Sequence, residues 1–341
     1  MPMLDIFNSD AFSVTSLTDA INKLKFVPGY LGSRGLFAES GVVTTSIAIE
    51  QKNNVLVLVP PTPRGGPGVT LDKGKRSLLS INVPHFEIND AVFAEEVQNI
   101  RPFGQESGEE SVMNLLGQRM QTDGQSQEAT IEYSRIGAVK GIVTYADGST
   151  LNLFNVFGVA QPAEIGFDLS NAAPVPGVLR KLCQQTIRQI AVALDGTPFT
   201  GVEALCGDQF FDNLIAHPEV RASYLNWNAA QELRQSYVSG GDTYGSFPWG
   251  GILWTNYRGQ VGTQAFIDPT KANIFPTGVP GLFRTYFAPA DYMDTVNTLG
   301  QPRYVRQYPM QNQKGVHLDV QTNNLNICTR PTALFQGRMG A

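Results

Sequence analysis

The chain has 341 residues, of which 42% are hydrophobic and only 16% charged, and its net charge is −5. This length allows about two domains with buried cores. The charged fraction is well below the roughly 25% usual in soluble domains. Because no run of Lys or Arg occurs, direct wrapping of nucleic acid is disfavoured. No apolar run approaches the roughly 20 residues of a membrane span, and no secretion signal opens the sequence.

Two further features of the composition bear on function. Low charge combined with ordinary hydrophobicity indicates that much of the nominal surface faces other protein rather than water. The three cysteines, Cys183, Cys206 and Cys328, are far apart and lack CxxC spacing. This pattern predicts reduced thiols in a cytosol.

The N-terminal stretch contains a short predicted helix at 16–24, in which Leu17, Ile21 and Leu24 fall at helical spacing. A loop punctuated by glycines follows up to Gly41. A helix on such a tether is typical of an arm that docks on another molecule. The alternative is a terminal helix that closes its own fold, and the pattern does not separate the two.

The most informative segment is 44–90. Alternating runs, Thr44–Val59 and Leu79–Ile88, flank a tip rich in Pro and Gly at 60–68, which predicts a β-hairpin with a long tip. A single strand over the first run would be roughly 50 Å long, whereas ordinary strands have about 5–6 residues. We therefore expect an arm that lies on another molecule. The alternative breaks the first strand at Asn53-Asn54 and folds two short hairpins into a local sheet.

The next segment is mainly helical. One or two helical turns are expected at 90–97. A longer helix is predicted from about Glu109 to Val139, bent near Gly124, with a helix–turn–helix as the alternative. Asp147-Gly148 then predicts the turn of a short hairpin at 141–154.

From a Pro-rich linker at 172–177 the pattern becomes α/β. Helices are predicted at 179–194, after Gly207-Asp208, and briefly at 291–297. Strands are predicted at 202–206, 252–257, 282–289, 303–310, 316–320, 325–328 and 333–335. The Gly- and Ser-rich stretch 237–250 has the composition of an exposed loop.

A search for catalytic chemistry finds no constellation. The three histidines, His85, His217 and His317, lack metal-ligand spacing and are interpreted as structural. No P-loop or GxSxG elbow occurs. The least unsuitable candidates for an α/β hydrolytic enzyme are Asp208, Glu203 and His217. We expect no catalytic residue, no cofactor and no metal site, and therefore no enzyme.

Several motifs, together with this order of elements, point to a known family. They are Ala204 to Asp212 (ALCGDQFFD), His217 to Arg221 with Tyr224, Leu4 to Phe7, Asp319 to Gln321 and Arg330 to Leu334. Over nearly its whole length the chain resembles the lambda-like major capsid protein E family of tailed phages, which has the HK97-type fold.

The resemblance implies an α+β fold divided into five segments. These are an N-terminal arm (1–43), a β-hairpin called the E-loop (44–90), a peripheral domain with a spine helix (91–177), an axial α/β domain (178–300) and a C-terminal β segment returning to the peripheral domain (301–341). The E-loop residues expected to contact a neighbouring subunit are Val55, Val57, Val59, Arg64, Lys73, Arg76, Leu79 and Ile81. Those expected near the capsomer axis are Tyr237, Tyr244, Phe247 and Trp249.

The resemblance also implies partners. Copies of the chain would form hexamers and pentamers of an icosahedral head that encloses double-stranded DNA without sequence-specific binding. The chain would assemble in the host cytoplasm and reside in the virion. Only about 43 residues precede the hairpin, so we expect a separate scaffold protein, with a portal and a decoration protein as further partners. Lys73 and Lys75 are available for a covalent crosslink, but we expect none. A tail or other oligomeric virion protein is the alternative.

Overall fold

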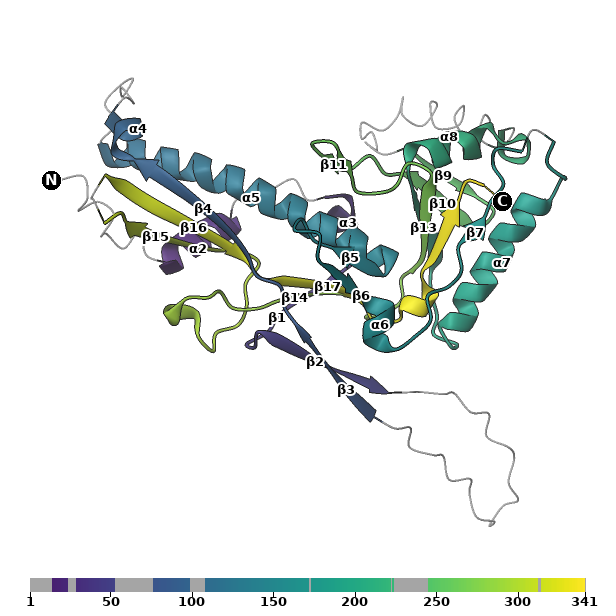
Figure 1. Ribbon diagram of the computed structural model, residues 1–341, viewed down its shortest axis with the longest axis horizontal. Helices are drawn as coiled ribbons and strands as arrows, with labels where there is room; N and C mark the ends of the chain where they lie inside the picture. Colours follow the sequence, from purple (N-terminus) through teal and green to yellow (C-terminus); the bar gives the residue numbers. More distant parts are fainter. Residues whose placement is uncertain are drawn as a thin grey trace, which may run out of the picture. The chain divides into compact units, whose positions relative to one another are not determined.

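The computed structural model describes residues 14–23, 29–52, 76–98, 108–171, 173–221, 223, 245–311 and 314–340 (Figure 1). They divide into two compact units, each assembled from separate stretches of chain. Unit 1 draws on Met1–Ala48, Ser80–Ser134 and Arg284–Asn326, and unit 2 on Ile49–Leu79, Arg135–Phe283 and Ile327–Ala341. The C-terminal segment is therefore shared between the units. No helix in the described ranges is long and apolar enough to cross a membrane.

Unit 1 is built on an antiparallel sheet in the order β15-β16-β4. Its strands are β15 (Tyr304–Pro309), β16 (Gly315–Thr322) and β4 (Phe86–Phe93). The expectation that Phe86 and Ile88 continue the second strand of the hairpin is wrong. The alternation was recognised, but it specifies which face a side chain occupies and not which strand is the partner. The helical turn expected at 90–97 begins only with α4 (Ala94–Gln98).

Two helices contribute to the core of unit 1 on one face of this sheet. Leu17 and Ile21 of α2 (Val14–Lys23) pack with Leu116 and Met120 of α5 (Gly108–Lys140) and with the inward side chains of the strands. The Thr18 hydroxyl also accepts a hydrogen bond from the β15 backbone at 3.2 Å. Burial of each large aliphatic side chain contributes about 1.5–3 kcal/mol. The helix that closes its own fold is thus confirmed, and so is a single long helix in place of a helix–turn–helix.

A second sheet of three strands has the order β1-β14-β17. Its strands are β1 (Ala38–Gly41), β14 (Phe283–Phe287) and β17 (Asn324–Cys328). Buried polar side chains satisfy one another beside it: the Asn326 amide donates to Asn324 at 2.8 Å and accepts from Thr285 at 2.6 Å. Such pairing removes most of the cost of burying amides and hydroxyls.

A short helix, α3 (Tyr30–Ser33), occupies the glycine-punctuated loop. The Glu132 carboxylate of α5 accepts hydrogen bonds from the backbone N–H groups of Leu31 and Gly32 at 2.8 and 3.4 Å. A Cβ on Gly29 would lie 2.2 Å from the Glu132 side chain. A side chain at this point of the loop would therefore displace Glu132 from its hydrogen bonds to Leu31 and Gly32.

Unit 2 is built on a mixed sheet of six strands (Figure 1). In sheet order they are β7 (Ile165–Gly166), β18 (Phe335–Arg338), β13 (Lys271–Thr277), β8 (Gly201–Cys206), β10 (Ile252–Asn256) and β9 (Ser246–Trp249). Helices α7 (Val178–Ala193) and α8 (Asp208–Ala216) contribute to one hydrophobic cluster with this sheet. The β segment near the C-terminus is paired, as predicted, but with β13 and β7.

The core of unit 2 is centred on Trp254 of β10, which is fully buried. Its indole stacks on Phe210 of α8 and meets Phe167 edge-on, with centroid distances of 5.9 and 5.6 Å. Its N–H donates to the Trp249 carbonyl at 3.0 Å, so the one polar atom of the ring is satisfied. The opposite face of the sheet is also buried at Leu205 and Phe275.

The predicted Asp-Gly hairpin is confirmed. Strands β5 (Ile142–Thr144) and β6 (Thr150–Asn152) pair antiparallel, and Gly148 in the turn has φ +82°, a backbone conformation that glycine adopts without strain. A short helix, α6 (Leu153–Phe157), follows. The remaining elements are strands β11 (Gln260–Val261) and β12 (Gln264–Ala265) and the 3-10 helices η2 (Met293–Thr295) and η3 (Pro331–Ala333).

Candidate subunit interface

The described base of the predicted arm is a two-stranded ribbon. Strands β2 (Ser46–Lys52) and β3 (Arg76–Asn82) pair with each other, and the Val83 N–H donates to the Thr45 carbonyl at 2.9 Å. Ile81 is buried and Leu79 is half-buried. Arg76 is the first residue of β3. The remaining predicted contact residues, Val55, Val57, Val59, Arg64 and Lys73, lie outside the described residues. The length of the arm beyond Lys52 therefore stays a prediction.

A surface that the sequence analysis missed is the face of the β15-β16-β4 sheet opposite α2 and α5. Tyr308, His317 and Ala91 form one cross-strand row on it, and the Tyr308 and His317 rings are 5.0 Å apart. Tyr308 and nearby Phe93 are 43% and 47% exposed. We call Phe93, Ala91, Tyr308 and His317 the open sheet face. The register between strands, which alternation alone does not give, brings them together.

A charged cluster lies at the β4 end of unit 1. The Arg119 guanidinium of α5 is 3.6 Å from Asp90 and 3.1 Å from Glu96. The hydrogen bond that this guanidinium donates to the Glu96 carboxylate raises the pKa of Arg119. Asp123, one helical turn further along α5, is buried. This burial and the nearby charge of Asp90 raise its pKa to about 6.

Two residues expected near the capsomer axis have a different local structure from the one predicted. Phe247 and Trp249 belong to β9, an edge strand of the six-stranded sheet. Phe247 is buried and Trp249 packs partly buried against the core of unit 2. The expectation of an exposed loop is therefore wrong for both, because strand pairing with β10 overrides the glycines around them. Tyr237 and Tyr244 lie outside the described residues.

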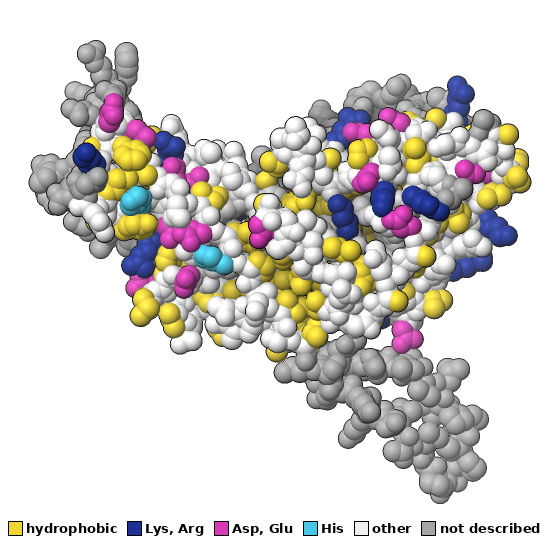
Figure 2. Space-filling model, in the orientation of Figure 1, with side chains coloured by type: hydrophobic (Ala, Val, Ile, Leu, Met, Phe, Trp, Pro, Cys, Tyr) yellow, Lys and Arg dark blue, Asp and Glu magenta, His cyan; other side chains and the backbone are white. Residues whose placement is uncertain are grey.

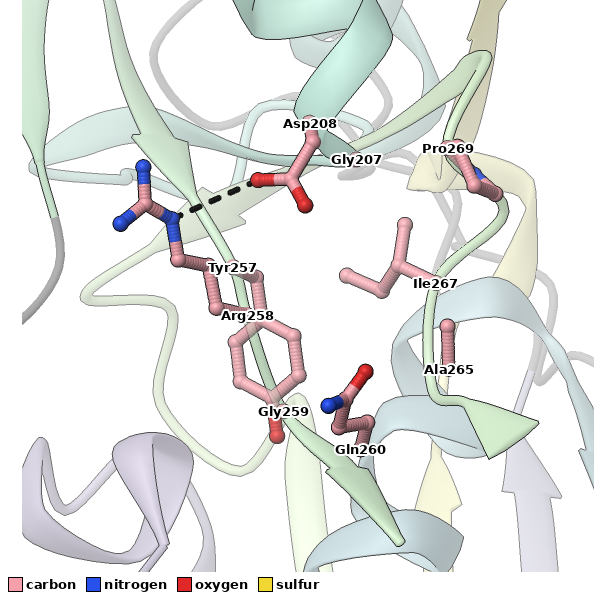
Figure 3. Close-up of a pocket in the computed structure, with 9 residues that line it drawn as sticks. All are labelled: Gly207, Asp208, Tyr257, Arg258, Gly259, Gln260, Ala265, Ile267 and Pro269. Atoms are coloured by element: carbon pink, nitrogen blue, oxygen red, sulfur yellow. Dashed lines mark ion pairs between the residues drawn. The ribbon is translucent and has the colours of Figure 1, made fainter. Parts of the chain in front are cut away.

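The hydrolase alternative requires a reactive pocket around Asp208. An open cavity of about 200 Å³ lies beside Asp208. Figure 3 shows the side chains of Asp208 and Arg258 pointing toward each other. Their atoms Oδ1 and Nε are 3.4 Å apart, and both side chains are mostly exposed. The lining residues are Gly207, Asp208, Tyr257, Arg258, Gly259, Gln260, Ala265, Ile267 and Pro269. They include no histidine, cysteine or serine that could act as base or nucleophile.

The other two candidates lie elsewhere. Asp208 is the first residue of α8, with Gly207 as its N-cap, while His217 follows the last residue of the same helix. At 1.5 Å per residue these two are roughly 13 Å apart. Glu203 is buried in β8, where the Thr255 hydroxyl donates to it at 3.4 Å. The three do not form a constellation. Among the described residues, no group of three potential ligands could hold a metal ion.

Each histidine has a local structural contact. The His217 ring accepts a hydrogen bond from the Glu219 backbone at 3.3 Å. His85 lies 2.8 Å from Asn323 and 3.2 Å from Glu87. His317 packs on Tyr308 in the open sheet face. These contacts agree with the structural interpretation of all three.

Comparison with known families decides which class of protein carries these surfaces. The model of the family "Phage major capsid protein E" matches residues 13–339. The chain belongs to this family. It is therefore a phage capsid protein with a structural role, and its place in the phage particle is the capsid.

Two relatives and one solved structure are similar over almost the whole capsid protein. It is 25% identical to the major capsid protein of Pseudomonas phage KPP10, over 96% of this chain and 97% of the relative. It is 24% identical to that of Salmonella phage Felix O1, over 99% of each chain. A crystal structure described as a candidate capsid protein of an E. coli CFT073 prophage superposes with a TM-score of 0.62 at 12% identity, covering 96% of this chain and 99% of that one. The HK97-type α+β fold is thus confirmed.

Proposed function

We propose that this capsid protein assembles into hexamers and pentamers that close an icosahedral head around double-stranded DNA, and that its β2–β3 hairpin lies on a neighbouring copy. The observation that carries the proposal is the isolated ribbon. Among the described strands, β2 and β3 pair with each other and with no third strand. A two-stranded ribbon is marginal in water, so packing on another copy would provide the missing stabilisation.

The open sheet face is the surface we assign to the neighbour's hairpin. It offers Phe93, Tyr308 and the His317 ring, all partly exposed. Aromatic side chains bury large areas and are enriched at protein interfaces. Its other side is already filled by the core of unit 1, so only the outer side is available to a partner.

Charge supports a shell that encloses DNA without binding its sequence. On the face drawn in Figure 2, apolar and uncharged side chains predominate, with both signs of charge interspersed among them. The chain carries a net charge of −5, which disfavours the recruitment of phosphates. In this proposal, residues 91–177 form the peripheral domain and residues 178–300 the axial domain. The chain assembles in the host cytoplasm, where a separate scaffold protein, a portal and a decoration protein act with it. The chain performs no catalytic step.

The hairpin is tested by deleting residues 61–68 and expressing the chain with its scaffold. We expect no closed shells, because the tip can no longer engage a neighbour, while far-UV circular dichroism and the melting temperature of the monomer stay unchanged. Electron microscopy of negatively stained particles gives the readout. An unchanged yield of shells would contradict the arm hypothesis, and tubes or rings from the full-length chain would favour the tail-protein alternative.

The open sheet face is tested by Phe93→Ser combined with Tyr308→Ser. A matched control is Val261→Ser in β11, which removes an equally exposed apolar side chain (56% exposed) from unit 2. We expect the double variant, but not the control, to lose shells while keeping a folded monomer. Equal shell yields from the two variants would remove this face from the interface.

A further inference from the structure

Residues 288–303 form the loop that joins β14 to β15 (Figure 1). Its own polar side chains hold it in one conformation. The buried Thr295 hydroxyl lies 2.7 Å from the Ala290 carbonyl and 2.9 Å from the Tyr292 carbonyl. The Thr298 hydroxyl donates to the Thr295 carbonyl at 2.7 Å. These contacts order the loop without help from any other molecule.

Contacts with the sheet of unit 1 anchor the same loop. The Tyr292 hydroxyl donates to the Asp319 carbonyl of β16 at 3.2 Å. The Tyr304 hydroxyl of β15 accepts from the Gln301 backbone at 2.9 Å. Tyr292 and Tyr304 are buried together with Ala290 in a small apolar cluster. The loop is therefore a rigid part of the unit.

The large aliphatic side chains of this loop are exposed. Its buried members include Tyr292, Thr295 and the small Ala288 and Ala290, whereas its large aliphatic side chains point outward. The exposed fractions are 87% for Met293, 58% for Val296 and 64% for Leu299. Single exposed apolar residues are common on proteins, but a group of them on an ordered loop marks an interaction site.

A fourth exposed apolar residue, Val43, adjoins this group. The Gly300 N–H donates to the Val42 carbonyl at 2.9 Å, and a Cβ on Gly41 would lie 2.3 Å from the Gly300 carbonyl oxygen. The two segments thus run in backbone contact, which only glycine permits. Val43 is 50% exposed. We call Val43, Met293, Val296 and Leu299 the β14–β15 patch.

The surroundings of the patch identify the kind of partner it fits. The exposed charged groups on the loop itself are Asp291 and Asp294, because Arg303 is buried. Asp294 is already paired with Arg306 at 3.4 Å. Carboxylates beside aliphatic side chains disfavour nucleic acid. Val43 also lies only three residues before β2, so the patch continues directly into the base of the hairpin that we assign to a contact between copies.

We propose that the β14–β15 patch is a second contact between copies of this chain, seated on an apolar surface of a neighbouring copy. This inference rests on the proposed assembly into a shell. The loop is ordered before docking, so little conformational entropy is lost when its side chains are buried. The patch acts as a rigid apolar contact at the base of the hairpin.

The first test replaces the three loop residues together, Met293→Ser, Val296→Ser and Leu299→Ser. The matched control is Val178→Ser with Val192→Ser, two exposed valines of α7 (54% and 79%). Light scattering gives the critical concentration for assembly, and thermal melts check the monomer. We expect the triple variant to raise the critical concentration at least about tenfold, because less apolar surface is buried, and the control to leave it unchanged.

Each result of this test is informative. An unchanged critical concentration for the triple variant overturns the inference alone, provided that deletion of residues 61–68 abolishes shells. An equal rise of the critical concentration in the triple variant and in its control also overturns the inference, because exposed apolar residues in general would then be responsible. A full-length chain that forms no shells overturns the proposed assembly and this inference together.

The second test uses Val296→Cys as a chemical probe. All three native cysteines are buried, so the new thiol is the only exposed one. We expect a small maleimide to label it at least about tenfold more slowly in shells than in dilute monomer, while Val192→Cys is labelled at similar rates in both. Equal rates at residue 296, or protection that appears only after a different protein is added, would overturn a second copy as the occupant.

Discussion

Asp123 lies on the same stripe of α5 as Leu116 and Met120, at positions that follow the helical repeat toward the core of unit 1. Only 8% of this residue is exposed. Burial is the main cause of its raised pKa, to about 6, with a further contribution from Asp90, while Arg119 opposes the shift. A carboxyl that holds its proton in the fold but loses it when unfolded makes the stability of unit 1 depend on pH.

The direction of that dependence is fixed. Between about pH 4 and 6 the folded chain binds a proton that the unfolded chain has released, so stability falls as the pH rises. Asp123→Asn removes this effect. We expect the variant to be more stable than the parent by about 1–2 kcal/mol at pH 7 and equally stable at pH 4. Urea unfolding at both pH values measures the difference.

Asp294→Asn is the control for this prediction. Its carboxylate forms an ion pair with Arg306 but is mostly exposed, and exposed pairs contribute only about 0–1 kcal/mol. We expect a small effect that does not change sign between pH 4 and pH 7. An Asp123→Asn gain that is as large at pH 4 as at pH 7 would show that packing, and not the proton, causes it.

Helix α5 contains two glycines in contrasting surroundings. A Cβ on Gly137 would lie 2.6 Å from the Val143 Cα, whereas a Cβ on Gly117 meets nothing within 4 Å. In an open helical position, alanine is favoured over glycine by roughly 1 kcal/mol. At Gly137 the close approach of β5 outweighs that preference, because the backbone of β5 would have to move.

The same substitution should therefore act in opposite directions at these two sites. We expect Gly117→Ala to stabilise the protein by up to about 1 kcal/mol and Gly137→Ala to destabilise it by about 1–3 kcal/mol. Chemical denaturation of both variants beside the parent protein is the measurement. Stabilisation by both would mean that β5 can yield, and would contradict the close packing of α5 on the β5–β6 hairpin.

The elements that the sequence predicted correctly are those with a strong local signal. The long apolar stripe of α5, the Asp-Gly turn and the helix at 179–194 all have the expected structure. Strand β13 was missed, although it lies inside the six-stranded sheet, because both of its faces are buried. It contains Asn273 and Pro276 and so shows no alternation. Burial on both sides removes the periodicity on which such predictions depend.

The candidate interface was predictable only in part, for a related reason. Alternation around a Pro- and Gly-rich tip predicted the hairpin, but the open sheet face needs the register between Tyr308, His317 and Ala91, which are far apart in sequence. Of the β14–β15 patch, the sequence placed only Met293 and Val296 in an element, the short helix expected at 291–297. Met293, Val296 and Leu299 could not be recognised as exposed, because sequence does not distinguish an outward apolar side chain from a core residue.

At the scale of the whole molecule, the low charge leads us to expect that the proposed shell is held by apolar contacts and strand pairing, without covalent bonds between copies. In the sequence, Lys73 follows Asp72 and Lys75 precedes Arg76. This cluster of charges favours hydrated ammonium groups over the desolvated lysine that a crosslink to asparagine needs. We expect mature particles boiled in SDS to migrate as single chains. A ladder of linked subunits on the gel would contradict this.

Because each unit is assembled from separate stretches of chain, the order of synthesis determines when each sheet can be completed. Strand β4 ends at Phe93, but its partner β16, the central strand of that sheet, begins only at Gly315. β18, placed between β7 and β13, begins at Phe335. A ribosome adds roughly 5–20 residues per second, so β16 is synthesised on the order of tens of seconds after β4. The sheet of unit 1 cannot be completed before β16 is made, nor that of unit 2 before β18. We therefore expect that half-made copies on one messenger cannot assemble with each other.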